Sequence, residues 1–381
     1  MISFLDLKKM NEPYETAFQE KLKSVLENGW YILGKETEIF EKAFAEYYQT
    51  KYCIGVGNGF DALVLIFKGY IQLGKLKKGD EVIVPANTYI ASILAILQAD
   101  LVPVLVEPKL ETYNINPDLI QEKITSKTKA ILAVHLYGQL AEMDKINEIG
   151  EKNNLLLVED AAQSHGAKGN FKSQILNSKF QSEENLQSKI YNLKSAIAYS
   201  FYPGKNLGCL GDGGAITTND SELAKVLFSL RNYGSEKKYY NNFVGVNSRL
   251  DELQAAFLNL KLPNLNADNT KRRLIAKRYL SEIKNNKIIL PFWDYSDNHV
   301  FHLFVIRTEN RENLQDYLTQ NNIQTVIHYP VPPHKQKAFP DWNNLSFPVT
   351  EKIHNEVLSL PISPVLTETE VDFIIEILNK Y

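Results

Sequence analysis

Cysteine is scarce in this chain, and so are long apolar runs and any strong excess of one charge. The 381 residues contain two cysteines, Cys53 and Cys209, too few for a disulfide framework or a zinc site. No apolar run approaches the ~20 residues that span a bilayer, and residues 1–9 lack the apolar core of a signal peptide. A formal net charge of −3 gives no reason to expect a nucleic-acid partner. These absences predict a cytoplasmic protein without a metal, membrane or nucleic-acid partner.

What the chain does have is an alternation of short apolar runs and amphipathic segments. It predicts strands at 52–56, 81–84, 102–106, 130–136 and 155–158, and helices at 61–73, 90–98, 117–123 and 143–152. Apolar strands alternating with helices indicate a mostly parallel sheet covered on both faces. Such sheets bind ligands at the carboxyl ends of their strands.

The second half of the chain predicts a further, smaller domain. Residues 168–194 are rich in Lys, Ser, Asn and Gln, and predict a surface excursion before a strand at 195–201. One face of a later helix is apolar at Leu250, Leu253, Phe257 and Leu260, and Pro263 should end that helix. Beyond it we expect a helix at 268–284, strands at 300–307 and 324–328, a helix at 312–321 and two terminal helices. The domains would then cover residues 1–262 and 263–381.

The strand predicted at 195–201 leads into a glycine-rich loop that carries Lys205. Pro203 and Gly204 precede the lysine, and four glycines follow it at positions 208, 211, 213 and 214. Glycines allow tight turns and leave space beside the backbone for a bulky ligand. A buried lysine loses its proton readily, and a neutral amine is what Schiff-base chemistry requires. The alternative is an ordinary surface lysine, against which the glycine density and the apolar strand both argue.

A second chemical signal is the acidic pair Glu159-Asp160, which follows the strand predicted at 155–158. The ends of buried strands are where α/β enzymes place catalytic groups. Taken alone, Asp160 could instead cap a turn or bind magnesium.

A third signal is the glycine-rich turn from Gly55 to Ala62, at a strand-to-helix junction. Backbone amides at the start of a helix form a site suited to phosphate. The turn also fits a dinucleotide-binding pattern, which requires an acidic residue at the end of the next strand. Here the nearest acids, Asp80 and Glu81, precede that strand. The turn therefore favours a phosphate site over a nicotinamide enzyme.

A phosphate-binding turn, a strand-end aspartate and a loop lysine are together what pyridoxal 5′-phosphate (PLP) requires. The chain resembles, over essentially its full length, the DegT/DnrJ/EryC1/StrS family of PLP-dependent sugar-nucleotide aminotransferases. The motifs that carry the resemblance are Glu159-Asp-Ala-Ala-Gln163, Ser200-Phe-Tyr-Pro-Gly-Lys-Asn-Leu-Gly208, Gly211-Asp-Gly-Gly-Ala-Ile216, and Arg231-Asn-Tyr-Gly234 with Asn247-Ser-Arg-Leu-Asp251. The resemblance implies the type I aminotransferase fold, an α/β fold with a large PLP domain and a smaller C-terminal domain. It also implies a homodimer with shared active sites.

The resemblance implies a role for each matching position. Lys205 would bind PLP covalently and transfer protons, and Asp160 would pair with the pyridine nitrogen. Gln163 would contact the ring hydroxyl, and Tyr89 would stack on the ring unless it is an ordinary core tyrosine. The phosphate would be held by Asn58, Gly59, Phe60 and Ser200, together with Asn247 of the partner subunit.

The lysine at position 205 favours transamination, because the dehydratases of this family carry a histidine there. The segments 57–63, 135–138 and 328–334 are most similar to those of enzymes that aminate C3 of dTDP-3-keto-6-deoxyhexoses, with L-glutamate as the donor. His328 and Tyr329 would then line the sugar pocket, or else belong to a proline-stiffened structural loop. Two alternatives stay open: C4 amination of a UDP-linked 4-keto sugar, and a non-catalytic PLP-binding regulator. The chain shows no basic patch or DNA-binding appendage to encourage the second.

Overall fold

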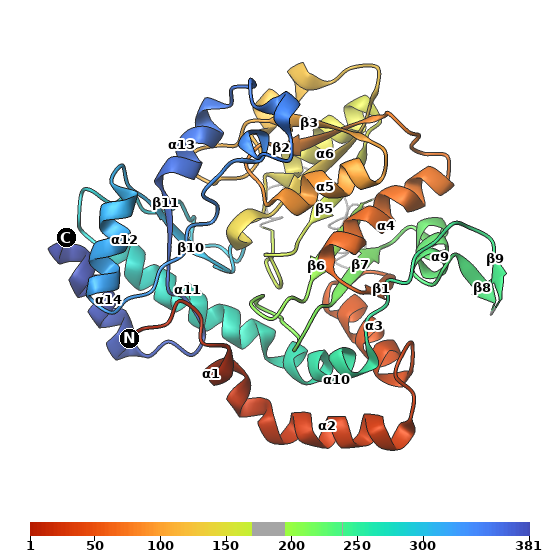
Figure 1. The fold of residues 1–381 in the computed structure, drawn as a ribbon, viewed down its shortest axis with the longest axis horizontal. Coiled ribbons are helices and arrows are strands. Elements are labelled where there is room, and N and C mark those ends of the chain that lie inside the picture. Colours follow the sequence, from red (N-terminus) through yellow and green to blue (C-terminus); the bar gives the residue numbers. More distant parts are fainter. Residues whose placement is uncertain (170–194, 238) are drawn as a thin grey trace, which may run out of the picture.

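A seven-stranded sheet forms the centre of the computed structural model, which describes residues 1–169, 195–237 and 239–381 (Figure 1). Most of the predicted surface excursion, residues 170–194, therefore lies outside the described residues. The strand order is β1-β7-β6-β5-β4-β2-β3. The strands are β1 (Tyr52–Val56), β2 (Glu81–Pro85), β3 (Val102–Val106), β4 (Thr128–Val134), β5 (Leu156–Asp160), β6 (Ala196–Ser200) and β7 (Gly214–Thr218). Strands β2 to β6 run parallel, and β7 is antiparallel to both of its neighbours.

Helices cover both faces of this sheet, because the strands are apolar on both sides. In β4, Ala130 and Leu132 enter one core, with α4 (Gly59–Gln72), α5 (Ile90–Gln98) and α9 (Ser221–Leu230). Ile131 and Ala133 enter a core on the opposite face, with α6 (Met143–Asn153). Nearer β1, that opposite face is covered by α3 (Lys35–Tyr47) and α10 (Glu252–Lys261). The predicted α/β architecture with a mostly parallel sheet is confirmed.

The C-terminal elements form a second group beside the sheet (Figure 1). They are α11 (Leu265–Glu282), β10 (Phe304–Arg307), α12 (Arg311–Gln320), α13 (Pro348–Glu356), β11 (Val357–Leu360) and α14 (Glu368–Lys380). Apolar side chains of α11, β10, α12, β11 and α14 form a separate core that also includes Ile2, which pairs with Ile323. Ile353 of α13 belongs instead to the core of the large sheet. After this contact the chain runs through α1 (Leu7–Asn11) and α2 (Glu15–Asn28) to α10, where Phe18 packs on Phe257. The domain boundary at residue 262 stays a prediction.

One predicted element is wrong and two differ in detail from the expectation. Residues 117–123 form two short 3₁₀ helices, Pro117–Leu119 and Gln121–Lys123, where one helix was expected. Residues 324–328 are not a strand: Val326 pairs with Ser359, but Gln324 hydrogen-bonds to Ile2 instead of continuing the pairing. The expected strand 300–307 starts only at Phe304, because Val300 and Leu303 donate backbone hydrogen bonds to residues 138 and 137 in the loop that follows β4.

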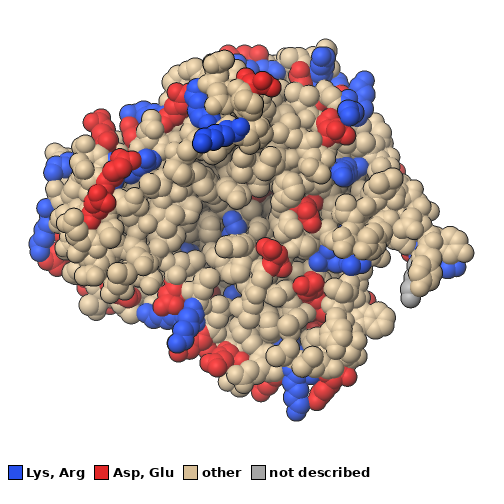
Figure 2. Space-filling model, viewed as in Figure 1, with Lys and Arg blue, Asp and Glu red and all other residues tan. Residues whose placement is uncertain are grey.

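The strands β7 and β11 were not predicted, nor was a small hairpin that projects from the molecule (Figure 1). The hairpin consists of β8 (Ser235–Lys237) and β9 (Tyr240–Asn241). On the face shown in Figure 2, basic and acidic side chains are interspersed rather than separated by sign. Within the described ranges, no helix is long and apolar enough to cross a membrane.

Candidate active site

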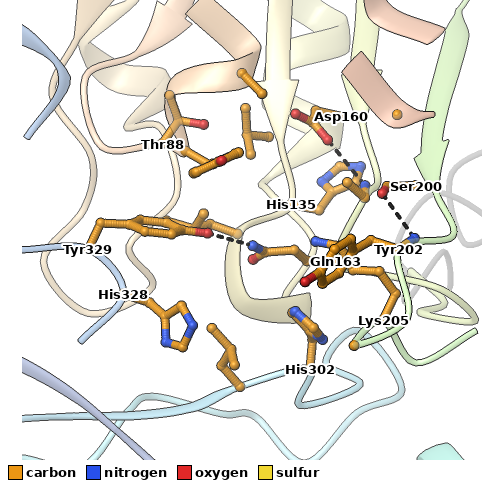
Figure 3. A pocket seen from close by; sticks show the side chains of 18 of the residues that line it. Thr88, His135, Asp160, Gln163, Ser200, Tyr202, Lys205, His302, His328 and Tyr329 are labelled. Atoms are coloured by element: carbon orange, nitrogen blue, oxygen red, sulfur yellow. Dashed lines mark hydrogen bonds between the residues drawn. The ribbon is translucent and has the colours of Figure 1, made fainter. Parts of the chain in front are cut away.

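A pocket of about 670 Å³ opens at the carboxyl ends of β4, β5 and β6, between the sheet and the C-terminal elements (Figure 3). Ten of the eleven predicted site residues line it: Asn58, Gly59, Phe60, Tyr89, Asp160, Gln163, Ser200, Lys205, His328 and Tyr329. These residues come from segments that lie far apart in the sequence, and the fold brings them together in one pocket. The eleventh residue, Asn247, is exposed and does not line the pocket.

Lys205 lies on a tightly closed loop directly after β6. Its backbone N–H donates to Tyr202 O at 2.9 Å, and the N–H of Cys209 donates to Phe201 O at 2.8 Å. A side chain at Gly208 would meet Pro203 O at 2.4 Å, so the loop closes only with glycine there. The lysine side chain is half-buried in the pocket wall, and this burial lowers its pKa to about 8, although the charge of Asp160 works in the opposite direction. The amine is therefore easier to deprotonate than that of a surface lysine.

Asp160 ends β5, and its carboxylate is held in place on the pocket side. Oδ2 accepts a hydrogen bond from Ser92 Oγ at 2.8 Å, and Oδ1 accepts one from the backbone N–H of Ala162 at 3.1 Å. Ser92 belongs to α5 and is itself in contact with Thr88 Oγ1 at 2.9 Å. With 8% of its surface exposed, Asp160 is buried but still borders the pocket. A fixed, buried carboxylate of this kind is suited to pairing with a cationic nitrogen of a ligand.

The start of α4 and the end of β6 form a cradle for an anion. Asn58 caps α4, its Oδ1 accepting from the N–H of Asp61 at 2.8 Å. A side chain on Gly59 would meet Ser200 Cβ at 2.6 Å, and one on Gly214 would meet the Asn58 carbonyl carbon at 2.4 Å. The first N–H groups of a helix have no partner within it and point toward such a space. The Ser200 hydroxyl lies beside them, so backbone amides and a hydroxyl converge as a phosphate requires.

Gln163 lies deeper in the pocket and connects the sheet to the C-terminal part. Its Oε1 accepts from the N–H of Tyr137 at 2.6 Å, and its Nε2 donates to the Tyr329 hydroxyl at 3.1 Å (Figure 3). Burial raises the pKa of the Tyr329 phenol, so this group stays protonated and its own O–H remains a donor. The Tyr89 ring lies 5.2 Å from that of Tyr329 and is 52% exposed, which excludes the core-tyrosine alternative.

The side chain of His328 also borders the pocket and forms a hydrogen bond with Ser359. Its Nδ1 lies 2.9 Å from Ser359 Oγ, and burial together with the charge of Lys205 lowers its pKa to about 4. The imidazole is therefore neutral at physiological pH. The backbone carbonyl of His328 accepts a hydrogen bond from the Tyr137 hydroxyl, which ties this loop to the large sheet.

The sequence reasoning missed several residues of the pocket. Ser92 orients Asp160, and His302 lies between His328 and Lys205 (Figure 3). The N-terminal residues Phe4 and Leu5 line the mouth of the pocket as well. For His302, the sequence offered one signal, a histidine within the apolar run 300–307. The other residues gave no signal, because their partners come from distant segments.

The donor set fits PLP. The cradle formed by Gly59, Asn58 and Ser200 suits a phosphate, Asp160 suits a protonated ring nitrogen, and Lys205 supplies an amine with a lowered pKa. All of them border one pocket, as this cofactor requires. The individual contacts of each residue with the cofactor stay predictions.

The fold and this set of pocket residues define a type I PLP-dependent aminotransferase. The chain belongs to the DegT/DnrJ/EryC1/StrS aminotransferase family, whose sequence profile matches residues 13–379. It is 56% identical over 381 residues to the dTDP-3-amino-3,6-dideoxy-alpha-D-galactopyranose transaminase of Aneurinibacillus thermoaerophilus, covering 100% of this chain and 99% of that protein. It is 42% identical over 386 residues to the dTDP-3-amino-3,4,6-trideoxy-alpha-D-glucose transaminase of Streptomyces venezuelae, covering 100% and 96%. The crystal structure of S. venezuelae DesV in complex with a ketimine intermediate superimposes with a TM-score of 0.90 at 42% identity, covering 100% of this chain and 98% of that one.

Proposed function

We propose that this protein is a PLP-dependent aminotransferase that transfers an amino group from L-glutamate to C3 of a dTDP-3-keto-6-deoxyhexose. The observation that carries the reaction type is the presence of Lys205 and Asp160 in one pocket beside an anion cradle. The observation that favours the substrate is the 56% identity, over the whole chain, to a transaminase that forms a dTDP-3-amino-3,6-dideoxy sugar. The reaction makes amino sugars for glycan synthesis, and we place it in the cytoplasm because both cysteines are free thiols.

When bound, PLP supplies an aldehyde that takes up the amino group and an electron-withdrawing ring that stabilises the negative charge formed during proton transfer. Lys205 holds or releases a proton at Nζ, and its pKa of about 8 lets it do both near neutral pH. Asp160, fixed by Ser92 and Ala162, would keep a positive charge on the ring nitrogen. The cradle at the start of α4 would hold the phosphate in the pocket that Lys205 also borders.

The sugar would enter from the side of the C-terminal elements. His328 and Tyr329 border that side of the pocket, and both are neutral. A neutral phenol and a neutral imidazole suit the hydroxyl groups of a sugar, whereas a charged side chain there would favour an ionic substrate. These two contacts are proposals for the sugar-binding residues.

We further propose a homodimer in which each active site uses residues of both subunits. Asn247 lies outside the pocket of its own chain, in a segment paired with Asn232 beyond α9. An exposed position there could reach the phosphate of a second copy, as the family resemblance implies.

The proposed reaction can be tested with a panel of keto sugar nucleotides and L-glutamate. We expect the highest kcat/KM with a dTDP-3-keto-6-deoxyhexose, of either C4 configuration, and no turnover by Lys205→Ala. A preference for a UDP-linked 4-keto sugar would identify the C4 enzyme instead. PLP binding without turnover of any keto sugar would identify a regulator.

A further inference from the structure

Ser248 is a buried residue whose hydroxyl holds two parts of the phosphate-binding turn. Its Oγ accepts a hydrogen bond from the backbone N–H of Gly57 at 3.0 Å and lies 2.6 Å from Oδ2 of Asp61. Because an N–H only donates and an ionised carboxylate only accepts, the single hydroxyl hydrogen is directed at Asp61. Only 2% of the Ser248 surface is exposed, and the residue does not line the pocket. The hydroxyl is therefore committed to the turn and not to a ligand.

The position of Ser248 is fixed by the residue that also holds the first glycine of the turn. The N–H of Ser248 donates to Arg231 O at 2.9 Å, and Nη1 of Arg231 donates to Gly55 O at 2.8 Å. Arg231 is buried and forms an ion pair with Glu41, whose Oε1 accepts from the N–H of Gly55 at 2.7 Å. The hydroxyl thus belongs to a rigid frame that is attached to the end of β1, directly before the turn.

Asp61 creates a conflict that this contact resolves. It is the third residue of α4, and a negative charge in the first turn of a helix stabilises that helix. The same positive helix end is where the phosphate of PLP would bind, in the cradle formed by Asn58, Gly59 and Ser200. Two negative charges at one helix end repel each other. In the structure Asp61 does not line the pocket, and its carboxylate is held at Ser248 instead.

We propose that Ser248 is a positioning residue, whose hydroxyl keeps the Asp61 carboxylate turned away from the phosphate site and so preserves the affinity of this site for a dianion. The inference rests on the proposed binding of PLP with its phosphate at the start of α4. An acidic side chain at the third position of a helix can reach back to the N–H of the cap residue, here Asn58. Without the Ser248 hydroxyl, the carboxylate is free to compete with the phosphate for that N–H.

Three substitutions separate the charge of Asp61 from the shape of the turn. Ser248→Ala removes the hydroxyl and leaves the carboxylate without this partner. Adding Asp61→Asn to Ser248→Ala removes the negative charge as well, while the hydrogen bond to Gly57 is still missing. Ser229→Ala is a matched control, because Ser229 of α9 is equally buried, with 2% exposed, and its Oγ has no hydrogen-bond partner among the described residues.

The readout is the rate of covalent capture by the cofactor-free protein, measured with PLP and with pyridoxal, which lacks the phosphate. The ratio of the two rates reports on the phosphate site, since a partly unfolded preparation lowers both rates together. We expect Ser248→Ala to lower this ratio at least about fivefold, and Ser229→Ala to match the wild type. Asp61→Asn, alone or combined with Ser248→Ala, should give a ratio at or above the wild-type value, because the repelling charge is gone.

Inorganic phosphate probes the same site without covalent chemistry. It should compete with PLP for the cofactor-free wild type, and half-inhibition of Ser248→Ala should need at least about threefold more phosphate. An unchanged ratio and unchanged competition in Ser248→Ala would overturn the proposal. An equal fall of both capture rates would overturn it by showing a general structural role. A low ratio that Asp61→Asn does not restore would overturn it in favour of the hydrogen bond to Gly57.

These measurements also distinguish the proposal from the proposed function. They need neither a sugar nor an amino donor, so a protein that captures PLP but transfers no amino group would refute the proposed function and leave the role of Ser248 intact. Capture of PLP by the wild type no faster than capture of pyridoxal would contradict the phosphate site, and the role of Ser248 with it.

Discussion

Lys205 owes its expected reactivity to its surroundings, since the loop after β6 places its amine in a partly closed pocket. A group with a pKa of about 8 is neutral in about one molecule in a hundred at pH 6 and in about half at pH 8. Covalent capture of PLP by the cofactor-free protein should therefore accelerate about tenfold per pH unit from pH 6 and level off above about pH 8. The rate can be followed by absorbance in buffers of constant ionic strength. A rate that continues to rise to about pH 10 would show an ordinary lysine.

Asp160 provides the second prediction at this scale. Asp160→Asn should retain the cofactor but lose about a thousandfold in kcat, or about 4 kcal/mol of transition-state stabilisation, since an amide cannot hold a positive charge on the ring nitrogen. Ser92→Ala removes one hydrogen bond to the same carboxylate and should cost only about tenfold. Steady-state kinetics with glutamate and a keto sugar give both values. Near-normal turnover of Asp160→Asn would contradict the assigned role.

At the scale of elements, the site depends on how closely β7 approaches the start of α4. A Cβ at Gly214 would lie 2.4 Å from the carbonyl carbon of Asn58, so Gly214→Ala must displace the phosphate cradle. We expect a loss of about 1–3 kcal/mol in the free energy of unfolding and at least about tenfold weaker PLP binding. Gly211→Ala is the control, because a Cβ there would meet only the end of the Gln254 side chain, at 3.2 Å, and no backbone atom. Denaturant unfolding and a PLP titration measure the two effects, and equal behaviour of the two variants would refute this account of the cradle.

The elements also show what the sequence could and could not predict. The strands β1 to β6 were predictable because each is a short, mostly apolar run, and all but the edge strand β3 are largely buried. β7 was missed because its first residue, Gly214, belongs to a glycine-rich segment that becomes a strand only by pairing with β1 and β6. Lys205 and Asp160 could be identified from local motifs. The contacts of Ser92 with Asp160 and of His302 with Asn206 join residues that are distant in sequence, and no local pattern contains that information.

At the scale of the whole molecule, the pocket is assembled from segments at both ends of the chain. The N–H of Phe4 donates to Gln324 Oε1 at 3.2 Å, and the Phe4 ring lies 5.6 Å from that of His328. A Cβ added at Gly204, directly before Lys205, would lie 3.4 Å from Leu5 Cδ2, so Leu5 packs beside this loop. The N-terminal segment therefore connects the C-terminal elements to the lysine loop.

The proposed dimer gives a prediction at this scale. Lys205→Ala and Asn247→Asp should each inactivate a homodimer, the second because a carboxylate repels the cofactor phosphate at close range. In a mixed dimer, one site receives both changes and the other receives neither, if Asn247 of the partner subunit completes each site. Mixing the two inactive proteins should then restore up to about half of the wild-type activity per mixed dimer. Subunit exchange verified by mass spectrometry, without any recovery of activity, would show that Asn247 does not act across the dimer.

The central claim is that this protein transfers an amino group from glutamate to C3 of a dTDP-linked keto sugar. The most direct test supplies L-glutamate labelled with a heavy nitrogen isotope, together with a dTDP-3-keto-6-deoxyhexose or, in a parallel assay, a UDP-linked 4-keto sugar, and determines the product by NMR. We predict the labelled nitrogen on C3 of the sugar, with 2-oxoglutarate formed in equal amount and no product from Lys205→Ala. Label on C4 of a UDP-linked sugar instead, or no transfer of label to any sugar, would contradict the account.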